Sequence, residues 1–351
     1  MDKSIEHDWS MTMLNWAYAY HRPSLKAKVK ATPEDFNVVE NLGFEPGGGG
    51  EHIWLLIDKR QQNTESVAKS LARQANVAYR DVSYSGLKDY YACTQQWFSI
   101  YKPGTADVNW QDFDLPGVVI KEYCRHKKKL RRGSHQSNSF VIRLTDVQGD
   151  HNDLLQRIKL VEESGVPNYF GEQRFGRNIN NLSQAHEMLT KQKRVKNKHL
   201  QSLLYSASRS WLFNCIVSKR IDDNNWNKLF PSEPANLSGS NSFFKTEGQP
   251  DEVNRLTSLD IHPTAPMWGD FDENKVREYA ELHAFELAAI REYSELSKGL
   301  EKARLQYQRR PIRFKVNNLV TEINDKSIVL QFDLMKGQYA TSVLRELIIT
   351  E

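Results

Sequence analysis

The sequence predicts an α+β fold in which a mixed sheet is interrupted by an inserted, largely helical domain. Segments typical of strands dominate the first 150 or so of the 351 residues, with hairpin-like and crossover connections mixed among them. Helical periodicity then prevails to about residue 301, and strand patterns return from residue 312. We therefore expect an N-terminal arm at 1–25, a discontinuous sheet domain at 26–155 and 311–351, and an inserted domain at 156–310.

The first sheet segment follows an arm that we expect to be loosely attached. Pro33 breaks the chain there, and Phe36, Val38 and Glu40 can then line one face of a strand. Glycines 47–50 predict a flexible loop, and a helix begins near Asn63 or Thr64, where apolar residues recur at helical spacing. Further strands are expected at 52–59, 81–84, 96–101, 118–123 and 140–144.

The middle of the chain is predicted to be mostly helical. Apolar periodicity indicates helices over 153–163, 182–191, 203–222 and 273–301, separated by polar loops of which 222–250 is the longest. Strands are expected again at 312–316 and 328–334.

Composition excludes several classes of protein. Hydrophobic residues make up 39% of the chain, with 8 Trp, 14 Tyr and 15 Phe, so it can bury a core and is not intrinsically disordered. It has no apolar run long enough for a membrane helix, and because residues 1–20 contain no apolar stretch typical of a signal peptide, we expect no secretory signal. Cys93, Cys124 and Cys215 are far apart and form no CxxC, which favours a reducing cytoplasm. No extended apolar stripe is left over, so a monomer is the default expectation.

The charge distribution points to nucleic acid. The net charge is only +4, but residues 125–132 (RHKKKLRR) contain six Lys or Arg, and residues 191–198 contain five. Such runs attract phosphate backbones, although each run alone also fits a solvated loop.

Metal and cofactor motifs are missing: no HxxxH, GxSxG, or GxGxxG between a strand and a helix occurs. We expect no metal and no cofactor.

The segment with the clearest chemistry is 84–100, where a glycine turn follows a strand and places Lys88 beside Asp89. A carboxylate on a loop at a strand end can act on a bound substrate, and neighbouring cations would keep it ionised. The alternative is that Asp89 caps a turn and Lys88 is solvated.

Two further segments fit a nucleic-acid site. Asn138 could bond a base edge and Phe140 could stack on a base, although Phe140 equally fits a core aromatic. Residues 165–178 interleave aromatics with Arg174 and Arg177, which suits RNA contact or a structured loop.

Five ordered segments match a known family. The chain resembles the tRNA pseudouridine synthase D (TruD) family from about residue 26 to 346. The matching segments are 30–36 (KATPEDF), 86–89 (GLKD), 130–133 (LRRG) with 138–140 (NSF), 166–176 (VPNYFGEQRFG) and 336–347 (KGQYATSVLREL).

The resemblance implies a tRNA-modifying isomerase. Such an enzyme converts uridine 13 in the D-arm of tRNA to pseudouridine without a cofactor, and its inserted helical part is called the TRUD domain. Asp89 falls on the family's catalytic aspartate. The residues implied to bind the substrate are Lys30, Lys88, Asn138, Phe140 and Tyr339. We assign the RNA backbone to Arg125, Lys127, Lys128, Lys129, Arg131, Arg132 and Arg174. Ser137 stands where a glycine is expected, so the local turn can differ.

The chemistry explains why these residue types are needed. Breaking the N-glycosidic bond and rejoining uracil through C5 requires a carboxylate as nucleophile or base, and a buried base must be flipped out of its stack. A non-catalytic tRNA-binding or chaperone protein would explain the basic runs equally well, but not the intact motif around Asp89. A glycoside hydrolase usually needs two carboxylates and would leave the basic runs unexplained.

Overall fold

The structure, a computed structural model, describes residues 15–351 apart from 105–107, 192 and 325. It divides into two compact units, which we treat separately. Of the described residues, those in 24–151, 316–340 and 348–351 form the sheet unit, and those in 15–23, 152–315 and 341–347 form the helical unit. The predicted α+β class is confirmed, whereas the domain boundaries drawn from the sequence remain predictions.

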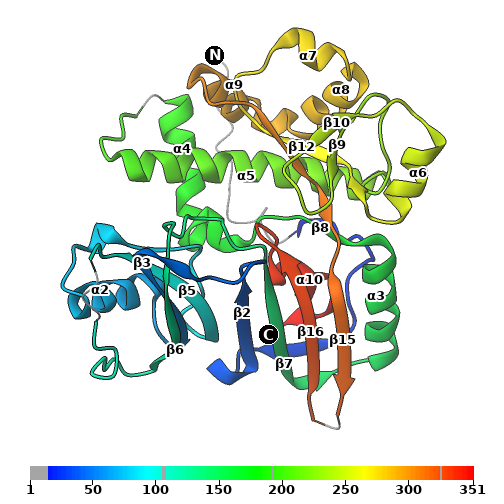
Figure 1. Cartoon of the computed structure of the whole chain (residues 1–351). Helices are drawn as coiled ribbons and strands as arrows, with labels where there is room; N and C mark the ends of the chain where they lie inside the picture. The colour runs from blue at the N-terminus through cyan, green and yellow to red at the C-terminus, as the bar shows by residue number, and fades with distance from the viewer. Residues whose placement is uncertain (1–14, 105–107, 192, 325) are drawn as a thin grey trace. The chain divides into compact units, whose positions relative to one another are not determined.

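A mixed sheet forms the sheet unit (Figure 1). Its strand order is β15-β16-β7-β2-β5-β3-β6, with β1 and β17 attached at β7 and β4 at β5. The β1–β17 and β2–β5 pairs are parallel and the others are antiparallel. The strands are β1 (Lys26–Val29), β2 (Phe36–Asn41), β3 (Gly48–Arg60), β4 (Val82–Tyr84), β5 (Cys93–Tyr101), β6 (Val118–His126), β7 (Ser137–Gln148), β15 (Asn317–Ile323), β16 (Ile328–Met335) and β17 (Ile349–Thr350).

Helix α2 (Thr64–Gln74) covers one face of this sheet (Figure 1). Alternating residues Ile53, Leu55 and Ile57 of β3 point to that face, where Val67 and Leu71 of α2 pack against them. The opposite face carries a second cluster around Trp54 and Trp97. A central pair of strands buried on both faces gives the loops at its ends a rigid base.

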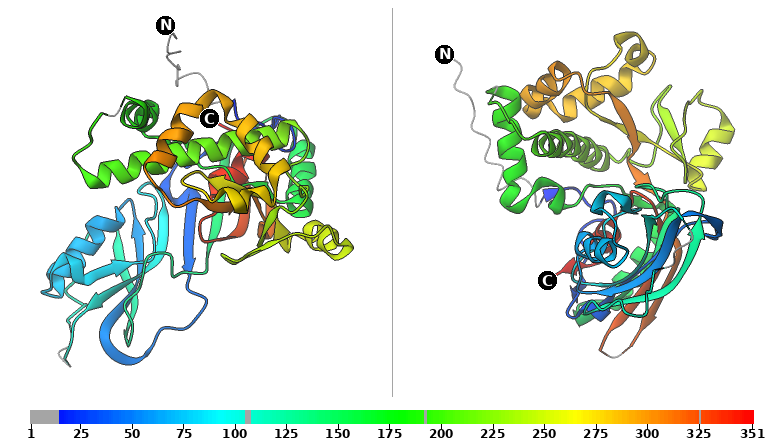
Figure 2. Two further views of the ribbon diagram at one scale, coloured as in Figure 1. Left: turned by 90° about the horizontal axis from the view of Figure 1, so that it is seen from above. Right: turned by 60° about the vertical axis from the view of Figure 1, so that its left-hand side comes forward.

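Helix α5 (Lys198–Asp222) is the central element of the helical unit (Figure 2). It packs against α4 (Asn180–Thr190), α8 (Ala280–Ala289) and α9 (Ser294–Lys302). The other helices are α3 (His151–Ser164), α6 (Pro250–Thr257), α7 (Glu273–Arg277) and α10 (Ala340–Leu347). The short strands are β8 (Val166–Pro167), β9 (Pro234–Leu237), β10 (Phe243–Lys245), β11 (Ile261–His262), β12 (Thr264–Met267), β13 (Gln308–Pro311) and β14 (Arg313–Phe314).

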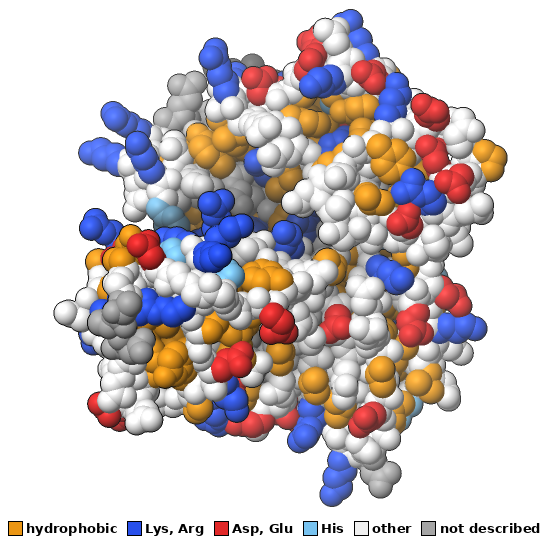
Figure 3. Space-filling view, viewed as in Figure 1, with side chains coloured by type: hydrophobic (Ala, Val, Ile, Leu, Met, Phe, Trp, Pro, Cys, Tyr) orange, Lys and Arg blue, Asp and Glu red, His pale blue; other side chains and the backbone are white. Residues whose placement is uncertain are grey.

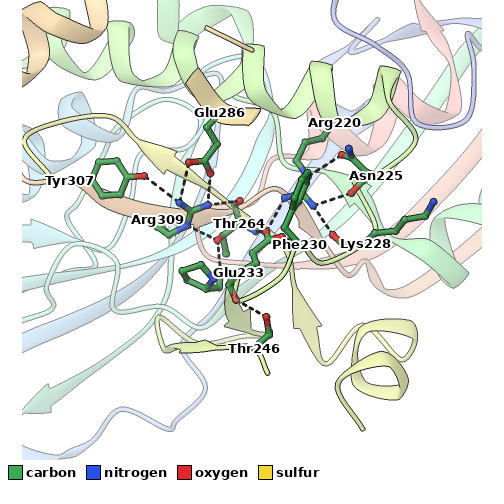
Figure 4. Close-up of polar contacts among 11 residues, drawn as sticks. Arg220, Asn225, Lys228, Phe230, Glu233, Thr246, Thr264, Glu286, Tyr307 and Arg309 are labelled. Carbon is green, nitrogen blue, oxygen red and sulfur yellow. Dashed lines mark hydrogen bonds and ion pairs between the residues drawn. The ribbon is translucent and has the colours of Figure 1, made fainter. Parts of the chain in front are cut away.

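Two buried ion pairs meet inside the helical unit (Figure 4). Arg220 binds Glu233 at 2.8 Å, and Arg309 binds Glu286 at 2.5 Å. Thr264 joins them, because its backbone N–H donates to Glu233 (2.7 Å) and its hydroxyl accepts from Arg309 (2.8 Å). Nearly every charge here has a partner of the opposite sign, as burial requires.

Several local predictions were wrong. Glycines 48–50 begin β3 rather than forming a loop, and the polar stretch 222–250 contains β9 and β10. The expected helix 273–301 is broken into α7, α8 and α9, with extended or irregular backbone at Tyr279 and Tyr293. The end of the predicted arm is tightly packed: the Tyr20 hydroxyl donates to the carbonyls of Leu160 (3.0 Å) and Gly165 (2.5 Å). Residues 1–14 of that arm lie outside the described residues.

None of the helices in the described part of the chain is long and apolar enough to cross a membrane.

Candidate active site

The loop of residues 85–92 joins β4 to β5 and carries Asp89. The Asp89 side chain is 44% exposed, so a substrate can reach its carboxylate. The Lys30 ammonium donates a hydrogen bond to Oδ2 of Asp89. The structure thus brings together two predicted site residues that are 59 positions apart in the sequence.

Lys30 is placed by an unusual backbone conformation. It follows β1 with φ of 60°, in the left-handed region that residues other than glycine rarely adopt. Its ammonium lies 3.9 Å from the centre of the Phe36 ring, a cation–π contact. The Tyr91 hydroxyl donates to the carbonyl of Ala31 at 3.2 Å, which ties the Lys30 turn to the Asp89 loop.

The backbone of the Asp89 loop from Ser85 to Asp89 is held by hydrogen bonds to neighbouring segments of the sheet unit. Such anchoring gives a catalytic side chain a defined direction. The contacts are Gly133 N–H to the Ser85 carbonyl (2.7 Å), Gln96 Nε2 to the Gly86 carbonyl (3.2 Å), Lys88 N–H to Thr64 Oγ1 (3.2 Å) and Lys59 Nζ to the Asp89 carbonyl (3.0 Å).

Lys88 is placed differently from its predicted role in substrate binding. Its side chain is 6% exposed, and its ammonium binds Oε2 of Glu40 at 2.8 Å. Oε1 of Glu40 accepts from the backbone N–H of Trp97 at 3.2 Å. Lys88 therefore fastens the loop to the core, and the partner it needs lies 48 residues earlier in the chain.

Asn138 begins the buried part of β7, directly opposite Glu40 in the sheet register. Its amide nitrogen lies 3.3 Å from Nε2 of His135, and Nδ1 of His135 lies 2.5 Å from the Ser85 hydroxyl. Burial lowers the pKa of His135, so the ring is neutral at neutral pH. This chain of contacts connects Asn138 to the first residue of the Asp89 loop.

The two predicted stacking residues have different environments. Phe140 is buried, edge-on to Phe36 and stacked on Phe332 at 5.4 Å between ring centres, so the structure places it as a core aromatic. Tyr339 is half-buried in the turn after β16. That turn is tied to the residues before Asn138, because the N–H of Lys336 donates to the carbonyl of Gln136 at 3.1 Å.

The basic run 125–132 continues from the end of β6 into the loop that precedes β7. Leu130 is buried and anchors it, while Lys127, Lys128 and Lys129 are exposed. The Trp54 indole donates to the Lys128 carbonyl at 2.9 Å, so the lysines stand on an ordered backbone. Figure 3 shows Lys and Arg side chains gathered near histidines on one face of the surface.

The remaining assigned cations divide between the two units. Arg131 and Arg132 are exposed in the sheet unit, and the guanidinium of Arg132 lies 5.7 Å from the Tyr84 ring centre. Arg125 is half-buried, with Nη1 donating to the Lys102 carbonyl at 2.8 Å. Arg174 lies in the helical unit beside the buried ring of Phe170.

Within the described ranges, no group of three or more His, Cys, Asp or Glu residues is arranged to hold a metal ion. The chemistry available at Asp89 is that of an accessible carboxylate beside a cation, on a loop whose backbone is fixed.

Comparisons with known proteins agree over nearly the whole chain. A sequence profile of tRNA pseudouridine synthase D (TruD) matches residues 14–193 and 179–347. The chain belongs to this family. It is 41% identical to tRNA pseudouridine synthase D of Legionella pneumophila over 340 residues, which cover 96% of this chain and 99% of that protein. It is 38% identical to the protein of that name from Methylococcus capsulatus over 332 residues, 94% and 93% of the two chains.

A solved structure shares the fold. A Methanosarcina mazei chain assigned to tRNA pseudouridine synthase D superposes with a TM-score of 0.68 at 20% identity, covering 95% of each chain. The resemblance to the TruD family predicted from the five sequence segments is thus confirmed.

Four buried residues of this TruD family member contribute to the candidate site without having been predicted from the sequence: Lys59, Glu40, Ser85 and His135. Glu40 was seen only as a strand residue. A signal for Lys59 was present, because Ile53, Leu55, Ile57 and Lys59 alternate along one strand face and the pattern places the lysine inside. A buried lysine next to a motif aspartate is a functional candidate.

Proposed function

We propose that this protein isomerises a uridine of tRNA to pseudouridine, with Asp89 as its catalytic residue. Family membership supports the reaction class. The observation that carries the proposal is the exposed carboxylate of Asp89, which pairs with Lys30. The loop that carries Asp89 is held by hydrogen bonds to buried residues such as Lys59.

The proposed reaction needs little from the protein besides position and charge. The N1–C1′ bond of uridine breaks, the uracil turns, a C5–C1′ bond forms, and the proton on C5 is released while N1 gains one. Asp89 serves as a nucleophile towards the nucleotide or as the base that removes a sugar proton. Lys30 stabilises its negative charge, and Asn138 and Tyr339 are proposed to contact the uracil. Phe140 supports that face from the core.

We further propose uridine 13 of the D-arm as the target, reached by flipping the nucleotide out of its stack. The exposed lysines 127–129 and the arginines of the same run supply a phosphate-binding edge of the sheet unit, and Arg174 of the helical unit is proposed as a separate contact with the RNA backbone. On this proposal the protein works in the cytoplasm, as a monomer and without a cofactor.

The test is tritium release from tRNA transcripts labelled at uracil C5. Wild type should release tritium, and Asp89→Asn should not, while its tRNA affinity stays within a few fold because the substitution is nearly isosteric. Replacing U13 by cytidine in the transcript should abolish release if that position is the target.

Each failure has a separate meaning. No release by the wild type on a tRNA that binds would favour a non-catalytic RNA-binding protein. Release by both proteins would refute Asp89 as the catalytic residue. Release that persists from the U13-substituted transcript would move the target elsewhere.

A further inference from the structure

Lys59 places a buried cation directly under the Asp89 loop. The residue is 2% exposed, near the end of β3. Its ammonium donates to the backbone carbonyl of Gln62 at 2.8 Å and to that of Asp89 at 3.0 Å. Both acceptors are neutral, and within the described residues no carboxylate lies at ion-pair distance from it.

Burying this charge is costly for the fold. Taking an ammonium out of water disfavours its charged form, and burial lowers the pKa of Lys59 to about 8. The ionisable groups that face it are Asp89, which attracts it, Lys88, which repels it, and Cys93 of β5. Thr94, its partner across the β3–β5 ladder, has a buried hydroxyl without a hydrogen-bond partner in the described residues.

An apolar side chain would suit this position better if only packing mattered. Ile53, Leu55 and Ile57 occupy the same strand face and form the core beneath α2. A methionine could continue that pattern without desolvating a charge. What the lysine adds is a hydrogen bond to the peptide of Asp89, the residue proposed to carry out the chemistry.

We propose that Lys59 is a positioning residue, whose ammonium fixes the Asp89 peptide and thereby aims the Asp89 carboxylate, without touching RNA. This inference rests on the proposed function of Asp89. Lys30 binds the carboxylate itself, whereas Lys59 binds the backbone of the same residue from the core. A reactive group displaced by about 1 Å can lose two orders of magnitude in rate.

The test compares Lys59→Met with a matched control, Lys102→Met. Lys102 also donates to a backbone carbonyl of the sheet unit, that of Ala75 at 2.9 Å, but has no contact with the Asp89 loop in the described residues. Single-turnover tritium release gives the rate, and filter binding gives the Kd for tRNA. Lys59→Met should lower the rate by at least about tenfold and leave the Kd within about twofold. Lys102→Met should change neither.

The pH profile separates positioning from general damage. The wild-type rate should decline as pH rises through about 8, because a neutral amine donates weaker hydrogen bonds than an ammonium, and Lys59→Met should lack this decline. Lys59→Gln, which can donate a neutral hydrogen bond to one carbonyl, should retain an intermediate rate without the decline. Thermal melts establish that each variant is folded.

The outcomes are distinguishable. A folded Lys59→Met with a rate within about twofold of wild type would overturn the role of Lys59 and leave the proposed function standing. A decline that begins near pH 8 and is the same in Lys59→Met would overturn it as well. A wild type that releases no tritium would refute the proposed function itself.

Discussion

The buried pair of Glu40 and Lys88 should be highly sensitive to substitution of either partner. The Glu40 side chain is fully buried and that of Lys88 is 6% exposed, at an N–O distance of 2.8 Å. Glu40→Gln keeps the size of the side chain but leaves the Lys88 ammonium buried without a counter-charge. Removing one partner of a buried pair typically costs about 3–5 kcal/mol.

The loss is measurable by urea unfolding followed through tryptophan fluorescence. With a urea dependence of about 2–3 kcal/mol per molar, the midpoint of the transition that reports the sheet unit should fall by about 1–2 M. The double variant Glu40→Gln with Lys88→Met removes both charges and should recover at least half of the loss.

An exposed ion pair of the same unit provides the control. Lys121 lies 3.7 Å from Asp58, with side chains 51% and 42% exposed, so Asp58→Asn should cost less than about 1 kcal/mol. The reasoning is refuted if Glu40→Gln costs no more than Asp58→Asn. It also fails if the double variant is no more stable than Glu40→Gln alone.

Three further predictions concern other parts of the chain. Lys127→Ala with Lys128→Ala should weaken tRNA binding and reduce the slope of log affinity against log salt by about 1–2; an unchanged slope would remove these lysines from the interface. Burial lowers the pKa of His262 to about 3 in the folded protein, from 6.5 in the unfolded chain. Between these pH values the imidazole is protonated only in the unfolded chain, so the free energy of unfolding should fall as pH falls from about 6.5 towards 3. His262→Gln should reduce this slope of the free energy of unfolding against pH, measured by urea titration, by up to about 1.4 kcal/mol per pH unit. The same slope in wild type and variant would contradict the prediction. Tyr20→Phe removes the hydrogen bonds from the Tyr20 hydroxyl to the carbonyls of Leu160 and Gly165, and the free energy of unfolding should fall by about 1–2 kcal/mol in thermal melts. An unchanged melting temperature would contradict this prediction.

The sequence predicted the elements whose signal is local. The alternation in 328–334 corresponds to β16, and the periodicity in 203–222 corresponds to most of α5. The break of the helix expected at 273–301 was not predictable, because Tyr279 leaves the helical conformation where its ring meets Arg309 from a distant strand. Hydrophobic spacing reports which face is apolar and says nothing of such contacts.

The same limit applies to the candidate site. Asp89 was predicted from its loop position and from a family motif, and Lys30 from a family motif alone; the structure brings them into contact. The orientation of Lys88 depends on Glu40. The alternation of Phe36, Val38 and Glu40 predicts the strand face on which Glu40 lies, but it does not predict that Glu40 pairs with a lysine 48 residues away. Sequence motifs thus predicted candidate site residues, and the structure adds which of them are exposed enough for a substrate to reach.

The joined ion pairs of the helical unit constrain how this protein can evolve. Thr264 links the Arg220–Glu233 pair to the Arg309–Glu286 pair. Replacing any one of the four charged residues by a neutral one would leave its partner as an unpaired charge in the interior. We therefore expect this cluster to be lost in evolution through paired replacements, because a single replacement leaves one buried charge without its partner. Stretches of loop can drift freely around it, but these positions are expected to change together or not at all.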